Sequence, residues 1–212
     1  MVIIYCRKGD SDAAISVLTQ CSVALARSLH NATDMEHIMP FVAESHILLA
    51  KWLQQSTNAL KNVETLKELA NIEADQRSLD MDASVLISRL IERAVQLFPS
   101  SADSWLAWGQ FQFDRAQHLT NHRLCLTALL DGVLTEPELN HLVESVNDLK
   151  DNVSQVVAAH PLLNKKPTVL KRVLAELNQR RNEAVRRCID SIKGFFTYLH
   201  HHRTGAQEDT VR

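Results

Sequence analysis

The sequence predicts an all-α protein, and three observations support this class. The 212-residue chain contains only five glycines and five prolines, so few turns are available. Helix-forming residues fill the segments between them. Apolar residues recur there at the helical period, and 45% of all residues are hydrophobic, which is enough to bury a core. We expect a stack of helices joined by short connections.

Charge and cysteine usage exclude several classes of partner. A formal net charge of -2 gives no overall attraction to nucleic acid or to an anionic membrane, and no apolar segment is long enough to span a bilayer. We therefore expect no direct nucleic-acid partner and no membrane. The cysteines lack metal-binding spacing, which predicts reduced, buried thiols in the cytoplasm, with the nucleus as the alternative; they are Cys6, Cys21, Cys125 and Cys188.

The N-terminal part contains two predicted amphipathic helices. Residues 2–8 resemble the end of a helix whose earlier turns are missing, so we expect a piece of a larger protein. A helix from Ser11 to about His30 follows, and the next begins between 34 and 40 after the capping box Thr33–Glu36. It ends near Gln55. The predicted apolar stripes are Ala14, Ile15, Leu18, Cys21, Leu25 and Leu29 in the first helix, and Phe41, Ile47 or Leu48, Ala50 and Trp52 in the second.

The middle of the chain carries a pattern typical of tetratricopeptide (TPR) repeats. Residues 56–79 are polar and predict a solvated helix or a loose connection, followed by a helix over about 82–98. The next helix opens with ADSWLAWGQFQFDRA, in which Trp105, Trp108 and Gly109 have TPR-like spacing after a proline. The glycine lets a partner helix come close. Gln112 stands where the TPR pattern expects an aromatic residue.

The C-terminal part is predicted to form long helices. A short helix over 124–130 precedes the capping box Thr135–Glu138, which starts a helix to about Ala159. The last helix holds one apolar stripe, namely Val169, Leu170, Val173, Leu174, Leu177, Ala184, Val185, Cys188, Ile192, Phe195, Phe196 and Leu199.

Together these elements predict a TPR- or HEAT-like helical-repeat stack, an α-solenoid segment. We expect TPR-like hairpins over 1–131, long C-terminal helices of the same stack over 132–202, and a flexible tail over 203–212.

The strongest candidate site is a basic patch near the start of the last helix. A solvated helix face is the simpler interpretation, because exposed Lys and Arg are ordinary there. The alternative is a binding surface for an acidic protein, a polyphosphate or RNA, although no aromatic residues interleave with the charges as single-stranded RNA binding requires. The basic patch consists of Lys165, Lys166, Lys171, Arg172, Arg180, Arg181, Arg186 and Arg187.

Other candidate sites have simpler explanations. His118 and His122 have the i,i+4 spacing of metal ligands but no third ligand, and His200–His202 is more typical of a polar helix end. At helical spacing, tryptophans are more often core residues than a ligand cage. We expect Trp52 to fill space between helices and Lys51 to face solvent. No catalytic constellation and no resident cofactor are predicted.

Three segments resemble the FAT region of the PI3-kinase-related protein kinases, and most closely the member that acts in nonsense-mediated mRNA decay. The first is IYCRKGDSDAAISVLTQCSVALARSL with AESHILLAKWLQ, similar to a hairpin that leads into a Leu-Ala-Lys-Trp helix. The second is ADSWLAWGQFQFDRA, similar to the Trp-rich helix that follows. The third is HPLLNKKPTVLKRVLAEL through SIKGFFTYLH, similar to the long helix that runs toward the kinase lobe. The linkers here are shorter and less acidic than in that family.

The resemblance implies a non-catalytic scaffold that clamps a Ser/Thr kinase domain of the same parent protein, within a complex whose substrate is the RNA helicase of the decay pathway. Its implied partners are that kinase domain and proteins of the mRNA decay complex. Some FAT regions hold an inositol polyphosphate through Lys and Arg, but the ligands cannot be matched here residue by residue. The alternative is a free-standing TPR-like adaptor that binds a peptide or a helix in its groove.

Overall fold

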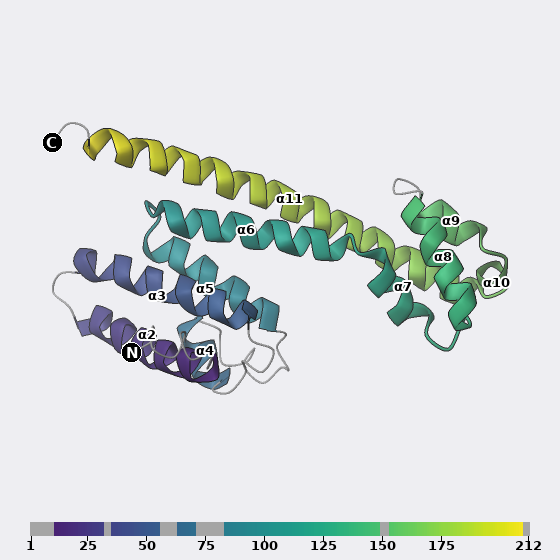
Figure 1. Ribbon diagram of the computed structural model, residues 1–212, viewed down its shortest axis with the longest axis horizontal. Coiled ribbons are helices and arrows are strands. Elements are labelled where there is room, and N and C mark those ends of the chain that lie inside the picture. The colour runs from purple at the N-terminus through teal and green to yellow at the C-terminus, as the bar shows by residue number, and fades with distance from the viewer. Residues whose placement is uncertain (1–10, 32–34, 56–62, 71–82, 149–152, 210–212) are drawn as a thin grey trace. The chain divides into compact units, whose positions relative to one another are not determined.

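The computed structural model describes residues 11–31, 35–55, 63–70, 83–148 and 153–209 (Figure 1). These residues form α-helices and turns and contain no strand, which confirms the all-α class. The chain divides into two compact units, one made of 1–111 and 192–212 and the other of 112–191. This division differs from the predicted boundary at residue 131, because α6 (Ala102–Leu119) and α11 (Pro167–Asp209) each contribute to both units.

The first unit is built from long helices that run in alternate directions (Figure 1). Its elements are α2 (Ser11–Asn31), α3 (Met35–Gln55), α4 (Val63–Leu69), α5 (Ala83–Leu97), the first part of α6 and the last part of α11. The central α3 packs against both α2 and α5. The core between them includes Ile15, Leu18, Leu49, Leu53, Leu66, Leu86, Leu90, Ile91 and Phe111.

The buried face of α3 is only partly the one that the sequence predicted. Ile47 and Ala50 are buried, as expected, but Phe41 is 62% exposed and is not part of the core. Instead, Val42 and Leu49 occupy the buried positions, since they lie on the same side of the helix as Leu53. The predicted start of this helix is confirmed, whereas Thr33 of the predicted capping box lies outside the described residues.

On α2, two polar residues take places that apolar residues were expected to hold. Thr19 and Ser22 are buried, and the Thr19 hydroxyl donates to the carbonyl oxygen of Ile15 at 2.8 Å. Cys21 is exposed, so its assignment to the apolar stripe was wrong. The prediction of buried thiols holds for Cys125 but fails for Cys21 and Cys188, because both lie on solvent-facing positions of their helices; Cys6 lies outside the described residues.

The polar segment after α3 contributes to the core. Within it, α4 buries Leu66 and Leu69, and Ala70 follows them into the same cluster. The expectation of a solvated helix or loose connection was therefore wrong for 63–70. The polar composition that suggested it comes from residues such as Glu68, which is exposed.

The second unit gathers shorter helices around its own core. They are α7 (His122–Leu130), α8 (Glu136–Asp148), α9 (Val153–Ala159) and α10 (Pro161–Asn164), together with the parts of α6 and α11 within 112–191. Fully buried side chains at the centre are Leu126, Leu130, Leu142, Val146, Val157, Leu163 and Val173.

The Glu138 half of the predicted capping box is present at Thr135. The Glu138 carboxylate accepts hydrogen bonds from the Thr135 N–H at 2.8 Å and from its hydroxyl at 2.7 Å. These bonds from Thr135 lower the pKa of Glu138. The predicted helix over 135–159 is two helices in the structure, α8 and α9, and they pack against each other.

The last helix is longer than predicted. α11 continues to Asp209, so the expected flexible tail over 203–212 is helical from Arg203 to Asp209. Its apolar stripe is buried only in the first half. Val173, Leu177 and Ala184 belong to the buried surface, but Val185 is exposed, and so are Cys188, Ile192, Phe196 and Leu199.

Candidate functional site

The basic patch is distributed around α11 instead of forming one cluster. Successive residues are turned by about 100° around an α-helix. Lys171 and Arg186 lie on the side away from the buried residue Val173, whereas Arg180 and Arg187 lie beside that buried line. Lys165 and Lys166 precede the helix, and both are exposed. Arg172 and Arg181 are exposed as well. The eight cations therefore do not all lie on one side of the helix.

Arg187 connects α11 to a buried amide of α6 within the second unit. Its guanidinium donates to Oε1 of Gln112 at 2.6 Å and to a carboxylate oxygen of Glu183 at 2.7 Å. Gln112 is only 2% exposed, so its amide oxygen depends on this donor. Gln112, the residue that departs from the TPR pattern, is thus the one that accepts the hydrogen bond from Arg187.

Glu183 is held between two arginines. Arg186 donates to both of its carboxylate oxygens, at 2.6 and 2.8 Å, and Arg187 donates to one of the same oxygens, Oε1, at 2.7 Å. The Arg186 hydrogen bonds, with support from Arg187, lower the pKa of Glu183 to about 2. Arg186 also lies 3.5 Å from Asp190. These ion pairs neutralise part of the charge that the sequence assigned to an anionic partner.

Arg180 caps the C-terminal end of α6. Its guanidinium nitrogens lie 3.3 Å from the His118 carbonyl oxygen and 3.4 Å from that of Leu119. Cations are favourable at this end of a helix because its last carbonyl groups lack intrahelical donors. Burial, together with the Arg180 charge, lowers the pKa of His122. Arg180 therefore has a structural task within the second unit.

Four members of the basic patch remain available to solvent. Lys166 is bonded to the Val133 carbonyl oxygen at 3.4 Å, and three arginines are engaged as described above. Lys165, Lys171, Arg172 and Arg181 form no hydrogen bond or ion pair with the described part of the chain. Any anion that binds this region would have to use these four side chains first.

The tryptophans belong to the packing of the first unit. Trp52 and Trp108 pack against its core, and Lys51 is exposed, as predicted. Trp105 meets Trp108 edge to face, with ring centroids 5.8 Å apart, and its indole N–H donates to the Pro99 carbonyl oxygen at 2.8 Å. Such pairing is a favourable aromatic geometry and fixes the first turn of α6.

Gly109 lies where α6 and α11 come close together within the first unit. A Cβ atom placed on Gly194 of α11 would lie 2.7 Å from the Gly109 Cα and 2.9 Å from Cε3 of Trp108. The helix that comes close to Gly109 is α11. The sequence signal that was missed is Gly194 itself, a lone glycine inside a long helical pattern.

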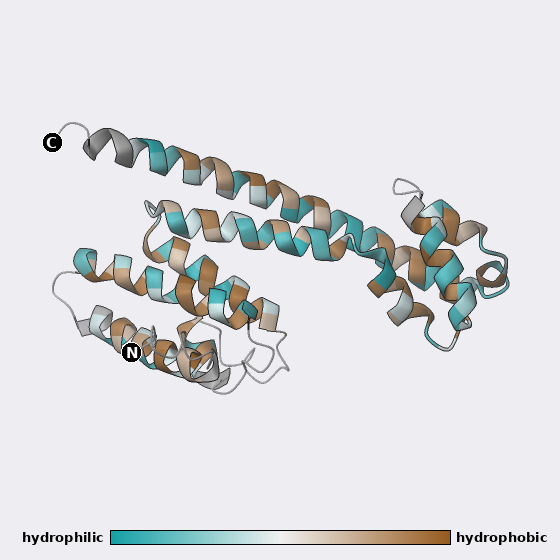
Figure 2. Cartoon of the chain, viewed as in Figure 1, coloured by the Kyte–Doolittle hydropathy of each residue, from teal (hydrophilic) through white to brown (hydrophobic). Residues whose placement is uncertain are grey.

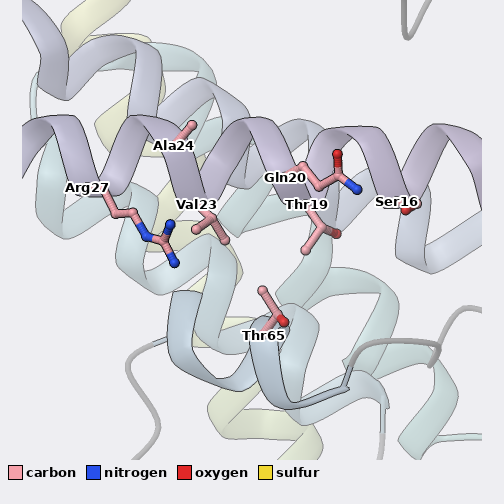
Figure 3. Close-up of a pocket in the computed structure, with 7 residues that line it drawn as sticks. All are labelled: Ser16, Thr19, Gln20, Val23, Ala24, Arg27 and Thr65. Atoms are coloured by element: carbon pink, nitrogen blue, oxygen red, sulfur yellow. The ribbon is translucent and has the colours of Figure 1, made fainter.

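A shallow pocket lies between α2 and α4. Its volume is about 380 Å³, and Figure 3 shows side chains of α2 beside Thr65 of α4. Five of its seven lining residues are polar, and the hydroxyl of one of them, Thr19, is already bonded to a backbone carbonyl. The sequence did not indicate this pocket because its polar residues look like an ordinary solvated helix face; they are Ser16, Thr19, Gln20, Arg27 and Thr65.

His46 is a buried histidine with two carbonyl neighbours. Its Nδ1 lies 2.7 Å from the Val42 oxygen and its Nε2 lies 3.3 Å from the Leu69 oxygen. A neutral imidazole can donate only one hydrogen bond, and the shorter distance assigns the proton to Nδ1. Burial lowers the pKa of His46, and the charge of Arg93 adds to this effect, against the two backbone hydrogen bonds.

The free energy of unfolding is expected to fall as the pH drops below about 6.5. The unfolded chain then binds a proton at His46 while the folded chain still excludes it, so protonation favours unfolding until the folded histidine also titrates. Urea titrations between pH 7.5 and pH 5 measure the slope. His46→Gln should flatten it, with a residual slope from His122, whose pKa is also lowered. An unchanged slope in the variant would contradict the assignment.

His118 is exposed and His122 is half-buried, and no group of three or more metal-ligating side chains comes together among the residues that the structure describes. Within the same residues, no helix is long and apolar enough to cross a membrane. No protein-family model, curated protein or solved structure matches the chain.

Proposed function

We propose that the chain is a non-catalytic, FAT-like scaffold segment of a PI3-kinase-related Ser/Thr protein kinase that acts in nonsense-mediated mRNA decay. The observation that supports this proposal best is the close contact between Gly109 and Gly194. These residues lie in two of the segments that resemble the FAT region, the Trp-rich helix and the long C-terminal helix. Residues that resemble one family at two distant places in the sequence are in contact in the fold.

The proposed arrangement is a TPR-like stack that supports the kinase domain and proteins of the decay complex in the cytoplasm. Alternating helix directions in the first unit favour such a stack, and α3 packs against α2 on one side and α5 on the other. Two half-buried arginines of α11, Arg180 and Arg187, favour a rigid scaffold, because their hydrogen bonds to α6 fix one helix against the other. The alternative is a free-standing TPR-like adaptor with the same packing.

Sequencing the full-length transcript across both ends of this reading frame tests the proposal. We expect the frame to continue past Arg212 into a domain with a glycine-rich phosphate loop and correctly spaced Asp, Asn and DFG residues. A stop codon after Arg212 in every transcript would favour the adaptor instead.

An inositol polyphosphate is the proposed ligand of the basic patch. Because Arg180 and Arg187 bind other parts of the protein, replacing them would disturb the fold together with any anion site. The informative variant changes Lys165, Lys171, Arg172 and Arg181 to alanine. We expect calorimetry with an inositol polyphosphate to detect binding to the wild-type chain and none to this variant. Equal binding by both proteins would reject the patch as the site.

A further inference from the structure

α11 carries an exposed apolar face that no described residue covers. Five of its six members recur every three or four residues and Cys188 adjoins one of them, which places the set along one side of a helix. Phe196 is 70% exposed, and the other members are also open to solvent. Hydrophobic positions alternate with polar ones along this helix (Figure 2). The exposed α11 face consists of Val185, Cys188, Ile189, Ile192, Phe196 and Leu199.

This face differs from the side of α11 that packs within the protein. The packed side carries small residues, Ala184, Ser191 and Gly194, all of them buried. Val185 and Ile192 each follow a packed residue by one position, and Phe196 follows Gly194 by two, which turns these three side chains about 100° to 200° away around the helix. These exposed residues are therefore not a continuation of the buried core. Their positions relative to one another are set by a single continuous helix, α11.

The charges on the same side of α11 have one sign. Lys171, Arg181, Lys193 and Arg203 project from the same side of the helical wheel as the apolar face, and all four are exposed. Glu183 and Asp190 lie toward the other side, where they pair with Arg186. A partner that covers this face would bury apolar surface in its middle and meet cations at its margins and ends.

We propose that the exposed α11 face binds an amphipathic helix of a partner protein, whose apolar stripe is bordered by Asp and Glu. Spacing of three and four residues is what a second helix requires, because its side chains fit between those of the first. Carboxylates beside that stripe match the four cations. A second copy of this chain fits less well, since cations would then face cations. The inference holds for a kinase scaffold and for an adaptor alike.

The test uses two synthetic helical peptides with leucine at every a and d position. One carries glutamate at the e and g positions and the other carries lysine there. Fluorescence anisotropy with the full 212-residue chain measures their binding. We expect the glutamate peptide to bind at least about tenfold more tightly than the lysine peptide, which corresponds to about 1.4 kcal/mol. Equal binding of the two peptides, or no binding of the glutamate peptide, overturns the proposal.

Matched variants locate the binding surface. Phe196→Asp should weaken binding of the glutamate peptide at least about tenfold. Leu124→Asp is the control, because Leu124 is also a large, exposed apolar residue but lies on α7 and not on α11. It should leave the affinity unchanged. Circular dichroism checks that both variants remain folded. An equal loss in the two variants contradicts the assignment to α11.

Charge reversal provides a second test that leaves the apolar residues intact. The double variant Arg181→Glu, Lys193→Glu should reverse the preference, so that the lysine peptide binds more tightly. An unchanged preference would reject the acidic partner. Two further results would also overturn the proposal. Self-association of the wild-type chain that Phe196→Asp abolishes would show that the face binds a second copy. Binding to phosphatidylserine vesicles, without binding to either peptide, would show that it binds a membrane surface.

Discussion

Replacing Gly194 with valine should lower the free energy of unfolding by about 3 kcal/mol, since a side chain there overpacks a tight contact. A Cβ atom at this position would lie within 2.9 Å of three heavy atoms, and two of them belong to the Gly109 backbone. Backbone atoms cannot move aside as a flexible side chain can. The two helices would have to separate, and the contact of Trp108 with the core would loosen with them.

Ala175→Val is the matched control for this substitution. Ala175 lies on the same helix and is exposed, so the new valine meets no neighbour and costs only the lower helix propensity of a β-branched residue, about 0.6 kcal/mol. Urea unfolding of both variants at constant pH measures the difference. Equal stability of the two variants would show that the contact between Gly109 and Gly194 is not tight in solution.

Replacing Arg187 with methionine should lower the free energy of unfolding by about 2 kcal/mol, because it leaves the buried Gln112 oxygen without a donor. The second partner, Glu183, loses less because it keeps Arg186. Methionine retains most of the volume of the arginine stem, so the missing hydrogen bond dominates the effect. Urea unfolding provides the measurement, and Arg181→Met, at an exposed position on the same helix, should cost less than about 0.5 kcal/mol.

A double-mutant cycle separates this hydrogen bond from general damage to the helix. Gln112→Leu removes the buried acceptor, so adding Arg187→Met to it should cost clearly less than Arg187→Met does alone. If the two substitutions are additive, Gln112 does not depend on Arg187 and the network has been assigned wrongly.

Most of the helices were predictable because their signals are local. Helix caps satisfy backbone groups within one turn, as Glu138 does for the Thr135 N–H and the Ser101 hydroxyl does for the Ser104 N–H at the start of α6. The sequence therefore marks those helix boundaries directly. The buried side of a helix depends instead on distant neighbours. Phe41 looked like a core residue by period, but Val42 and Leu49 are the buried residues of α3, which packs against α2 and α5. α11 likewise has two apolar faces, which periodicity alone merged into one.

The candidate site was less predictable, because the charges on α11 depend on what α6 offers them. From the sequence, Arg180 and Arg187 could not be distinguished from Arg172 and Arg181. The structure separates them, since the first two meet the last carbonyls of α6 and the buried Gln112. Gln112 itself appeared only as a departure from the TPR pattern. A buried polar residue at an expected aromatic position was the signal that an ion-pair network lies there.

The most direct test of the proposed kinase scaffold is a kinase assay on the natural protein. An antibody against residues 83–111 would isolate it from cells, and incorporation of phosphate from ATP into the RNA helicase of the decay pathway would then be measured. We expect phosphorylation by a fraction in which the recognised polypeptide is much longer than 212 residues and carries a kinase domain. A recognised polypeptide of only 212 residues, without phosphorylation of the helicase, would contradict the account.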